Sequence, residues 1–204
     1  MVQGIAAPAG GDIEAGIALL QQARRLLQEA GDDFTAGIAL GGLSGLALFR
    51  GEMEEAERYA EENVALAQRT GDALGLAYAL DRAAVVALVR QDLDQVRELL
   101  TAAIPLAVQV GQPDIVAYAF MGLAVVAAVE APVRAVRLCG AAERLVERAG
   151  VVLWPTRPRL DNAALDTARA ALGTDAFDAA WAEGRAMTRE QAVAYALAGE
   201  PVSV

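Results

Sequence analysis

The chain of 204 residues contains no histidine, and all 17 of its basic residues are arginine because lysine is also absent. A serine, threonine or cysteine nucleophile needs a neighbouring general base, and without these two residue types only carboxylates remain. Ser44 and Ser203 have no candidate base near them in the sequence. The sequence therefore predicts no catalytic triad, and we expect the chain not to be an enzyme.

The sequence also has only one cysteine and no cluster of basic residues. The single cysteine, Cys139, cannot form an intramolecular disulfide, and it falls at a position that is otherwise small and apolar, so we expect it in the core. No calcium-loop spacing occurs, which leaves no predicted metal or cofactor. The formal net charge of -10 and the lack of a basic stripe argue against nucleic acid as a direct partner.

Long hydrophobic runs are also missing, although the mean hydropathy is +0.33. The longest uncharged run, from Phe34 to Phe49, is shorter than the roughly 20 residues that span a bilayer. The chain does not open with a charged segment followed by an apolar core and a cleavage site. We therefore expect a cytoplasmic protein with no membrane partner.

The chain does contain a repeat of about 40 residues, and its clearest copy runs from Asp33 to Gly71. Apolar and small residues recur at helical spacing in two segments of this copy, which predicts two helices folded back on each other. Residues of the same kind occur at the equivalent positions one period and two periods later, and we call these equivalent positions slots. The first-helix slots are Leu40, Leu43, Ser44, Ala47; Leu80, Ala83, Ala84, Ala87; and Phe120, Leu123, Ala124, Ala127.

Glycine marks the end of each unit, because Gly31, Gly71, Gly111 and Gly150 all follow a long helical pattern where a left-handed glycine is expected. The fold class predicted is all-α, a solenoid of antiparallel helix pairs with a C-terminal helical cap. Thr188 begins the last helix with capping-box spacing. The predicted organisation is a lead-in at 1–11, a half unit at 12–31, full units at 32–71, 72–111 and 112–150, and capping helices at about 161–172, 175–186 and 189–198 within 151–204.

The first helix, about residues 12–30, matches only the second half of a unit. Its preceding helix is absent, as in a fragment of a longer array, and we expect an exposed apolar edge at this end. The apolar residues predicted to form one broad face are Ile13, Ile17, Leu20, Leu26 and Leu27.

The helix at about 33–50 carries Gly37, Gly41 and Gly45 four residues apart on one face. Each interior glycine costs roughly 1 kcal/mol relative to alanine, so some contact must favour a bare surface. One interpretation is close packing against a neighbouring helix, and the other is the floor of a shallow pocket. In the following acid-rich helix, Glu54 and Arg58 have the spacing of an ion pair on a solvated face.

The slot pattern resembles the tetratricopeptide repeat in a longer form. The run from Leu138 to Glu143, followed by later aromatic and small residues, is similar to the end of the helical sensor region in large bacterial signal-transduction ATPase regulators, which often carry a LuxR-type helix-turn-helix. The chain has no Walker motif, and it stops where a DNA-binding domain would often begin, so we expect neither ATPase nor DNA-binding activity from the resemblance. The later residues are Phe177, Trp181, Gly184, Gln191, Ala192, Tyr195, Ala196 and Leu197.

In tetratricopeptide repeats the first helix of each unit faces the concave side, and the resemblance implies which residues point inward. The groove predicted in this way is apolar, with two tyrosines and one carboxylate, and suits an apolar peptide, a helix or a small ligand. A rival interpretation is that the C-terminal segment, with Leu153 and Trp154, fills it. The groove residues are Ile38, Gly41, Gly45, Leu48, Tyr78, Asp81, Val85, Leu88, Tyr118, Met121 and Val125.

Together these features predict a non-catalytic sensor or protein-interaction module of a bacterial transcriptional regulator. Its partners would be an effector or a protein in the groove and the other domains of a longer regulator. The alternative is a structural module that self-associates into a homodimer through the exposed face of the first helix and the groove.

Overall fold

The computed structural model describes residues 13–151, 153 and 160–198, and these residues form ten α-helices and no strand. The prediction of an all-α chain is confirmed, and the helices predicted at about 12–30, 33–50, 161–172, 175–186 and 189–198 begin and end within one residue of those bounds. The helices are α1 (Ile13–Glu29), α2 (Asp33–Arg50), α3 (Met53–Thr70), α4 (Ala73–Arg90), α5 (Leu93–Val110), α6 (Pro113–Ala127), α7 (Pro132–Ala149), α8 (Leu160–Leu172), α9 (Thr174–Ala186) and α10 (Arg189–Leu197).

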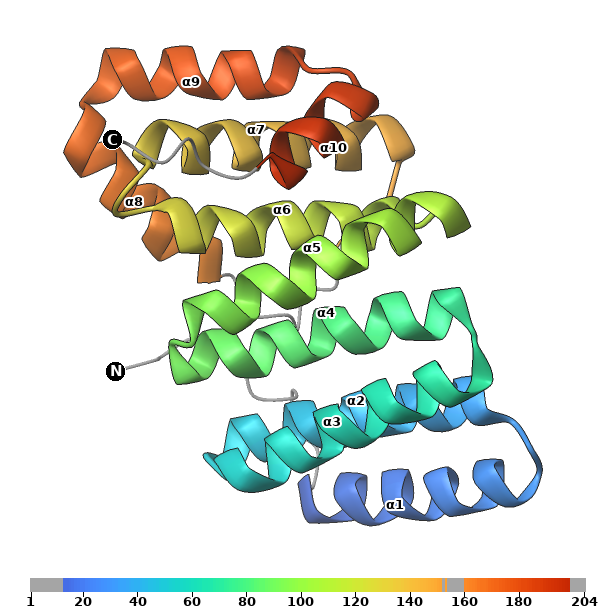
Figure 1. The fold of residues 1–204 in the computed structure, drawn as a ribbon. Helices are drawn as coiled ribbons and strands as arrows, with labels where there is room; N and C mark the ends of the chain where they lie inside the picture. Colours follow the sequence, from blue (N-terminus) through green and yellow to red (C-terminus); the bar gives the residue numbers. More distant parts are fainter. Residues whose placement is uncertain (1–12, 152, 154–159, 199–204) are drawn as a thin grey trace.

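The helices stack in chain order, from α1 at one end to α9 at the other (Figure 1). Each helix from α1 to α7 packs on the next one along the chain, and α2 also contacts α4, α4 contacts α6, and α6 contacts α8. The largest buried cluster runs from α4 through α7 and includes Phe120, Leu100 and Ile104. The same cluster also includes buried residues of α8 and α10, such as Ala164 and Ala192.

Local signals explain why the helices begin and end where they do. The side chain of Asp32 accepts a hydrogen bond from the backbone N–H of Thr35 at 3.0 Å and so caps the start of α2. At the last helix, Thr188 and Gln191 form the predicted capping box. The four unit-ending glycines are left-handed as predicted, with φ of 77°, 66°, 73° and 64° at Gly31, Gly71, Gly111 and Gly150.

Among the described residues, Gln91 alone has a positive φ without being glycine, and at 63° it ends α4 where Gly51 ends α2. A left-handed side chain costs about 1 to 2 kcal/mol. We predict that Gln91→Gly raises the free energy of unfolding by about 1 kcal/mol, measured by urea denaturation. Gln91→Ala keeps the strain and is expected to give no such gain; equal effects of the two substitutions would contradict this prediction.

Helix α1 leaves an apolar edge exposed, as predicted. Ile17, Leu20 and Leu27 pack against the cluster formed by α2 and α3. Leu26 was predicted on the same face, but this is wrong, because Leu26 is 56% exposed and Leu19 is 66% exposed. The broad face assigned to α1 therefore divides into a packed side and an open side.

The glycines of α2 serve more than one purpose. A methyl group at Gly37 would lie 2.8 Å from Oδ1 of Asn63, and one at Gly41 would lie 3.5 Å from Cγ of Arg82. A methyl group at Gly45 would meet nothing within 4 Å. The close-packing interpretation therefore describes Gly37, whereas a methyl group at Gly41 would make only ordinary van der Waals contact and Gly45 is open to solvent.

Two predictions about single side chains have different outcomes. Cys139 is buried with 3% exposure, which confirms its place in the core. Arg58 does not pair with Glu54; it forms its ion pair with Glu55, and its guanidinium lies 4.3 Å from the ring centroid of Tyr59. Spacings of three and four residues both bring helical side chains together, so sequence alone does not choose between the two carboxylates.

Helices α7 and α9 approach each other closely at two glycines. A methyl group at Gly184 would overlap the backbone carbonyl of Arg137, and one at Gly140 would lie 2.6 Å from the carbonyl oxygen of Trp181. Each glycine thus faces the backbone of the opposite helix. Only the absence of both side chains permits this approach.

Helix α10 is held by residues distant in the sequence. Arg134 at the start of α7 donates hydrogen bonds to the carbonyl oxygens of Ala196 at 3.1 Å and Ala198 at 2.8 Å. Arg189 donates to the carbonyl oxygen of Val108 in α5 at 3.2 Å. The first two bonds satisfy carbonyls that the end of a helix leaves without a partner.

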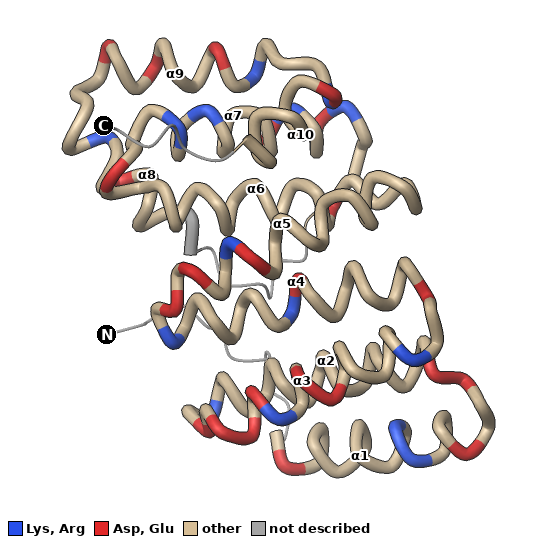
Figure 2. The backbone as a smooth tube through the Cα atoms, in the orientation of Figure 1, with Lys and Arg blue, Asp and Glu red and all other residues tan. Residues whose placement is uncertain are grey.

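Charge and hydropathy are unevenly distributed over the stack. Figure 2 shows carboxylates gathered along α3, whereas α6 is nearly free of charged residues. No helix within the described ranges combines the length and apolarity needed to cross a bilayer.

Candidate functional site

The predicted groove residues lie on α2, α4 and α6, but the structure does not expose all of them. Leu48, Asp81, Val85 and Tyr118 are buried, with 8%, 1%, 7% and 5% exposure. A ligand at this surface therefore has no direct access to these four side chains. The residues that remain open or half-exposed are Ile38, Gly41, Gly45, Tyr78, Leu88, Met121 and Val125.

The most exposed of these residues is Ile38, at 57%. Ile38, Tyr78 and Tyr118 occupy the same slot in successive units, yet their exposure falls from α2 to α6. Their slot is therefore open at the α2 end of the surface and closed at the α6 end. Leu88, Met121 and Val125, all half-exposed, continue the apolar surface over α4 and α6.

Tyr78 supplies the polar feature of this surface. Its hydroxyl donates a hydrogen bond of 3.5 Å to the Asp114 carboxylate, which joins α4 to α6. Burial raises the pKa of Tyr78, and the nearby Asp114 charge raises it further. The hydroxyl therefore stays protonated near neutral pH, and it acts as a hydrogen-bond donor within an otherwise apolar surface.

Of the two residues named in the rival C-terminal interpretation, the structure describes only Leu153. Leu153 is half-buried and packs against the largest cluster, which also borders Tyr78, Leu88, Met121 and Val125. Trp154 lies outside the described residues. The suggestion that this segment fills the groove stays a prediction.

A cavity of about 390 Å³ lies between α1, α2 and α3, at a place that sequence reasoning missed. Arg50 reaches Glu14 at 2.8 Å and Glu52 at 2.7 Å beside it, and Gln21 donates a hydrogen bond to the Tyr59 hydroxyl at 3.3 Å. These polar groups already satisfy one another. The lining residues are Glu14, Ile17, Ala18, Gln21, Leu43, Ala47, Arg50, Glu52, Glu55 and Tyr59.

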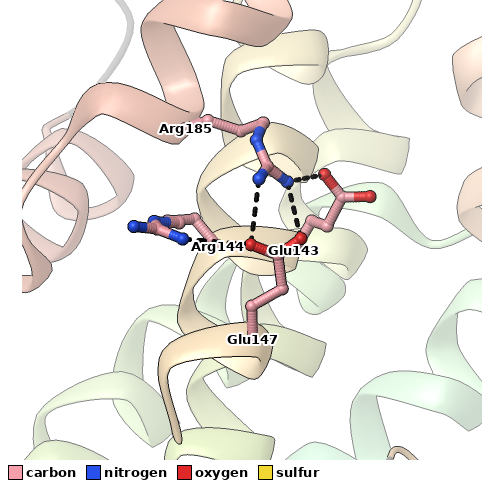
Figure 3. A network of polar contacts seen from close by, with 4 residues as sticks. All are labelled: Glu143, Arg144, Glu147 and Arg185. Carbon is pink, nitrogen blue, oxygen red and sulfur yellow. Dashed lines mark hydrogen bonds and ion pairs between the residues drawn. The ribbon is translucent and has the colours of Figure 1, made fainter. Parts of the chain in front are cut away.

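A second polar cluster fastens α9 to α7 (Figure 3). Arg185 donates to Glu143 and forms two hydrogen bonds with Glu147, at 3.0 Å and 2.9 Å, while Arg144 also reaches Glu147 at 3.2 Å. The hydrogen bond from Arg185 lowers the pKa of the Glu147 carboxyl. These groups are exposed and paired, so the cluster links α9 to α7 at the surface, beside the contact of Gly140 and Gly184. We call the interactions of Arg185 with Glu143 and Glu147 the Arg185 clasp.

These places offer apolar contact, hydrogen bonds and ion pairs. Across the residues that the structure describes, no group of three or more His, Cys, Asp or Glu side chains is arranged to hold a metal ion. The open positions on α2, α4 and α6 offer apolar and aromatic surface with one hydroxyl. Such a surface gains free energy by burying apolar groups of a ligand.

The fold and this surface define an all-α protein of consecutively packed helices with an apolar face. No family model matches the chain, and neither a curated protein nor a solved structure does. The resemblance to the tetratricopeptide sensor regions stays a prediction.

Proposed function

We propose that this protein is a non-catalytic binding module of the tetratricopeptide type, the sensor or interaction part of a bacterial transcriptional regulator. One observation supports the proposal most directly: α2, α4 and α6, the first helices of the three predicted units, contact one another in sequence. Ile38, Tyr78 and Met121 on these helices remain open or half-exposed at the implied inner positions.

The composition of this surface indicates what it binds. Ile38, Leu88 and Met121 offer apolar contact, Gly45 lets a ligand approach the backbone, and the Tyr78 hydroxyl can donate to an acceptor in place of Asp114. These properties fit an apolar peptide segment that carries hydrogen-bond acceptors. Binding would favour one arrangement of the stacked helices over another and so change the restraint on attached domains.

A peptide selection tests the proposal. We expect a displayed library of short peptides to yield apolar binders of the wild-type chain. The Ile38→Glu substitution places a charge on the open surface and is expected to weaken these binders at least about tenfold, measured by fluorescence anisotropy. Tyr78→Phe is expected to weaken those binders that carry an acceptor, because it removes the hydroxyl.

The matched control is Leu19→Glu, which alters a similarly exposed residue on the open side of α1, outside the surface of α2, α4 and α6. Binding to this variant is expected to equal that of the wild type. Failure to select any peptide, or equal affinity for wild type and Ile38→Glu, would contradict the proposal. Circular dichroism of each variant checks that helix content is unchanged.

A further inference from the structure

Helix α1 carries an exposed apolar stripe on the side opposite its packed face. Leu19 and Leu26 are 66% and 56% exposed, and Ala15 and Ala30, the residue just after α1, are also exposed. Their helical spacing places all four on one side. The packed face, with Ile17, Leu20 and Leu27, contacts the α2 and α3 cluster. Leucines this exposed lose the stabilisation that burial would provide, about 1.5 to 3 kcal/mol for a fully buried side chain.

The internal repeat allows the exposure of this stripe to be compared with that of the equivalent positions in α3. One period later, the slots of Leu19 and Leu26 are occupied in α3 by Tyr59 and Leu66. These residues are only 7% and 4% exposed, and they lie in one cluster with Leu40 and Leu43 of α2. Helix α2 covers these slots in α3, whereas no helix within the described ranges covers the corresponding stripe on α1.

The order of residues along the stripe indicates which kind of surface can pack against it. Ala15, Leu19, Leu26 and Ala30 read the same in both directions about the midpoint between Gln22 and Ala23. Two such stripes running antiparallel place each Leu19 against the other copy's Leu26, and each Ala15 against its Ala30. A surface that is complementary to itself in this way is what a twofold contact requires.

We propose that a second copy of this chain docks its α1 antiparallel on α1, across a twofold axis near Gln22. Among the residues that the structure describes, the opposite end of the stack is covered by α8, α9 and α10 and offers no matching open face for head-to-tail association. At the axis the two Gln22 side chains lie beside each other, and an amide can donate to and accept from its own copy.

The size of the contact sets the expected affinity. Helix α1 has 17 residues and is therefore about 25 Å long. One helix face of this length buries less than the roughly 1,000 Å² of a stable interface. The dimer is therefore weak and reversible, with a dissociation constant on the order of 10 µM.

Sedimentation velocity of the full chain tests this proposal. The weight-average sedimentation coefficient is expected to rise from the monomer toward the dimer between about 1 and 200 µM. Leu19→Glu is expected to remain monomeric throughout, since antiparallel pairing buries the new charge against the partner copy. Ile38→Glu, similarly exposed but on α2, serves as the control and is expected to dimerise as the wild type does.

Cysteine cross-linking locates the contact independently. Under oxidising conditions Gln22→Cys is expected to form a disulfide-linked dimer, whereas Glu61→Cys, on the exposed face of α3, is expected to remain monomeric. Cys139 is buried and does not compete. A wild type that stays monomeric at every concentration, or a dimer that survives Leu19→Glu, would overturn the proposal.

Discussion

Replacing Gly184 with alanine is expected to lower the free energy of unfolding by about 3 kcal/mol, the upper part of the range for overpacking. The added methyl group would overlap the carbonyl of Arg137, which belongs to the backbone of α7. A side-chain end can rotate away, but a helix backbone moves only with the whole helix. Helix α9 must then separate from α7, and the Arg185 clasp to Glu143 and Glu147 is strained with it.

Urea denaturation measures this loss, and hydrogen exchange shows whether α9 opens before the rest of the stack. The matched control is Gly45→Ala, the same substitution inside α2, where a methyl group meets nothing within 4 Å. That variant is expected to gain about 1 kcal/mol, because alanine favours the helix over glycine. A similar effect at both glycines would show that α7 and α9 do not approach as closely as described.

Phe120→Ala is expected to cost about 4 kcal/mol, the usual scale for removing a buried aromatic ring. Phe120 is 1% exposed and lies in the largest cluster, which joins α4, α5, α6 and α7. The cavity left by the ring would be surrounded by several helices at once. Their packing against other neighbours limits how far they can collapse into it.

The repeat itself supplies the control for this prediction. The equivalent slots in the earlier units hold Leu40 and Leu80, both buried, so the slot accepts leucine. Phe120→Leu is therefore expected to cost less than about 1.5 kcal/mol in the same denaturation experiment. Equal losses for leucine and alanine would contradict the equivalence of the three slots.

The positions of the helices could be predicted from the sequence because their signals are local. Glycines such as Gly71 and Gly111 adopt a left-handed conformation at low cost, and the capping box at Thr188 satisfies backbone groups within one turn. Each signal acts over a few residues. The bounds of the helices therefore follow without knowledge of which helices pack together.

The exposure of the candidate surface could not be predicted equally well. Helix α6 is apolar on every side, so its hydrophobic pattern does not show that Tyr118 is buried while Met121 and Val125 are half-exposed. On α1, Leu26 and Leu27 are adjacent in sequence; helical spacing groups Leu27 with Leu20, and the position of α2 determines that this side is the covered one. The cavity beside Arg50 depends on three helices meeting and has no local signal.

The tethering of α10 has a consequence for how the chain folds. Most helices pack on a neighbour in the sequence, and contacts of this kind form quickly because little chain entropy is lost in closing them. Arg189 and Val108 are instead 81 residues apart, and Arg134 and Ala198 are 64 apart. The Val108 carbonyl on α5 and the Arg134 guanidinium on α7 are in position only after those two helices have packed, so we expect α10 to dock last.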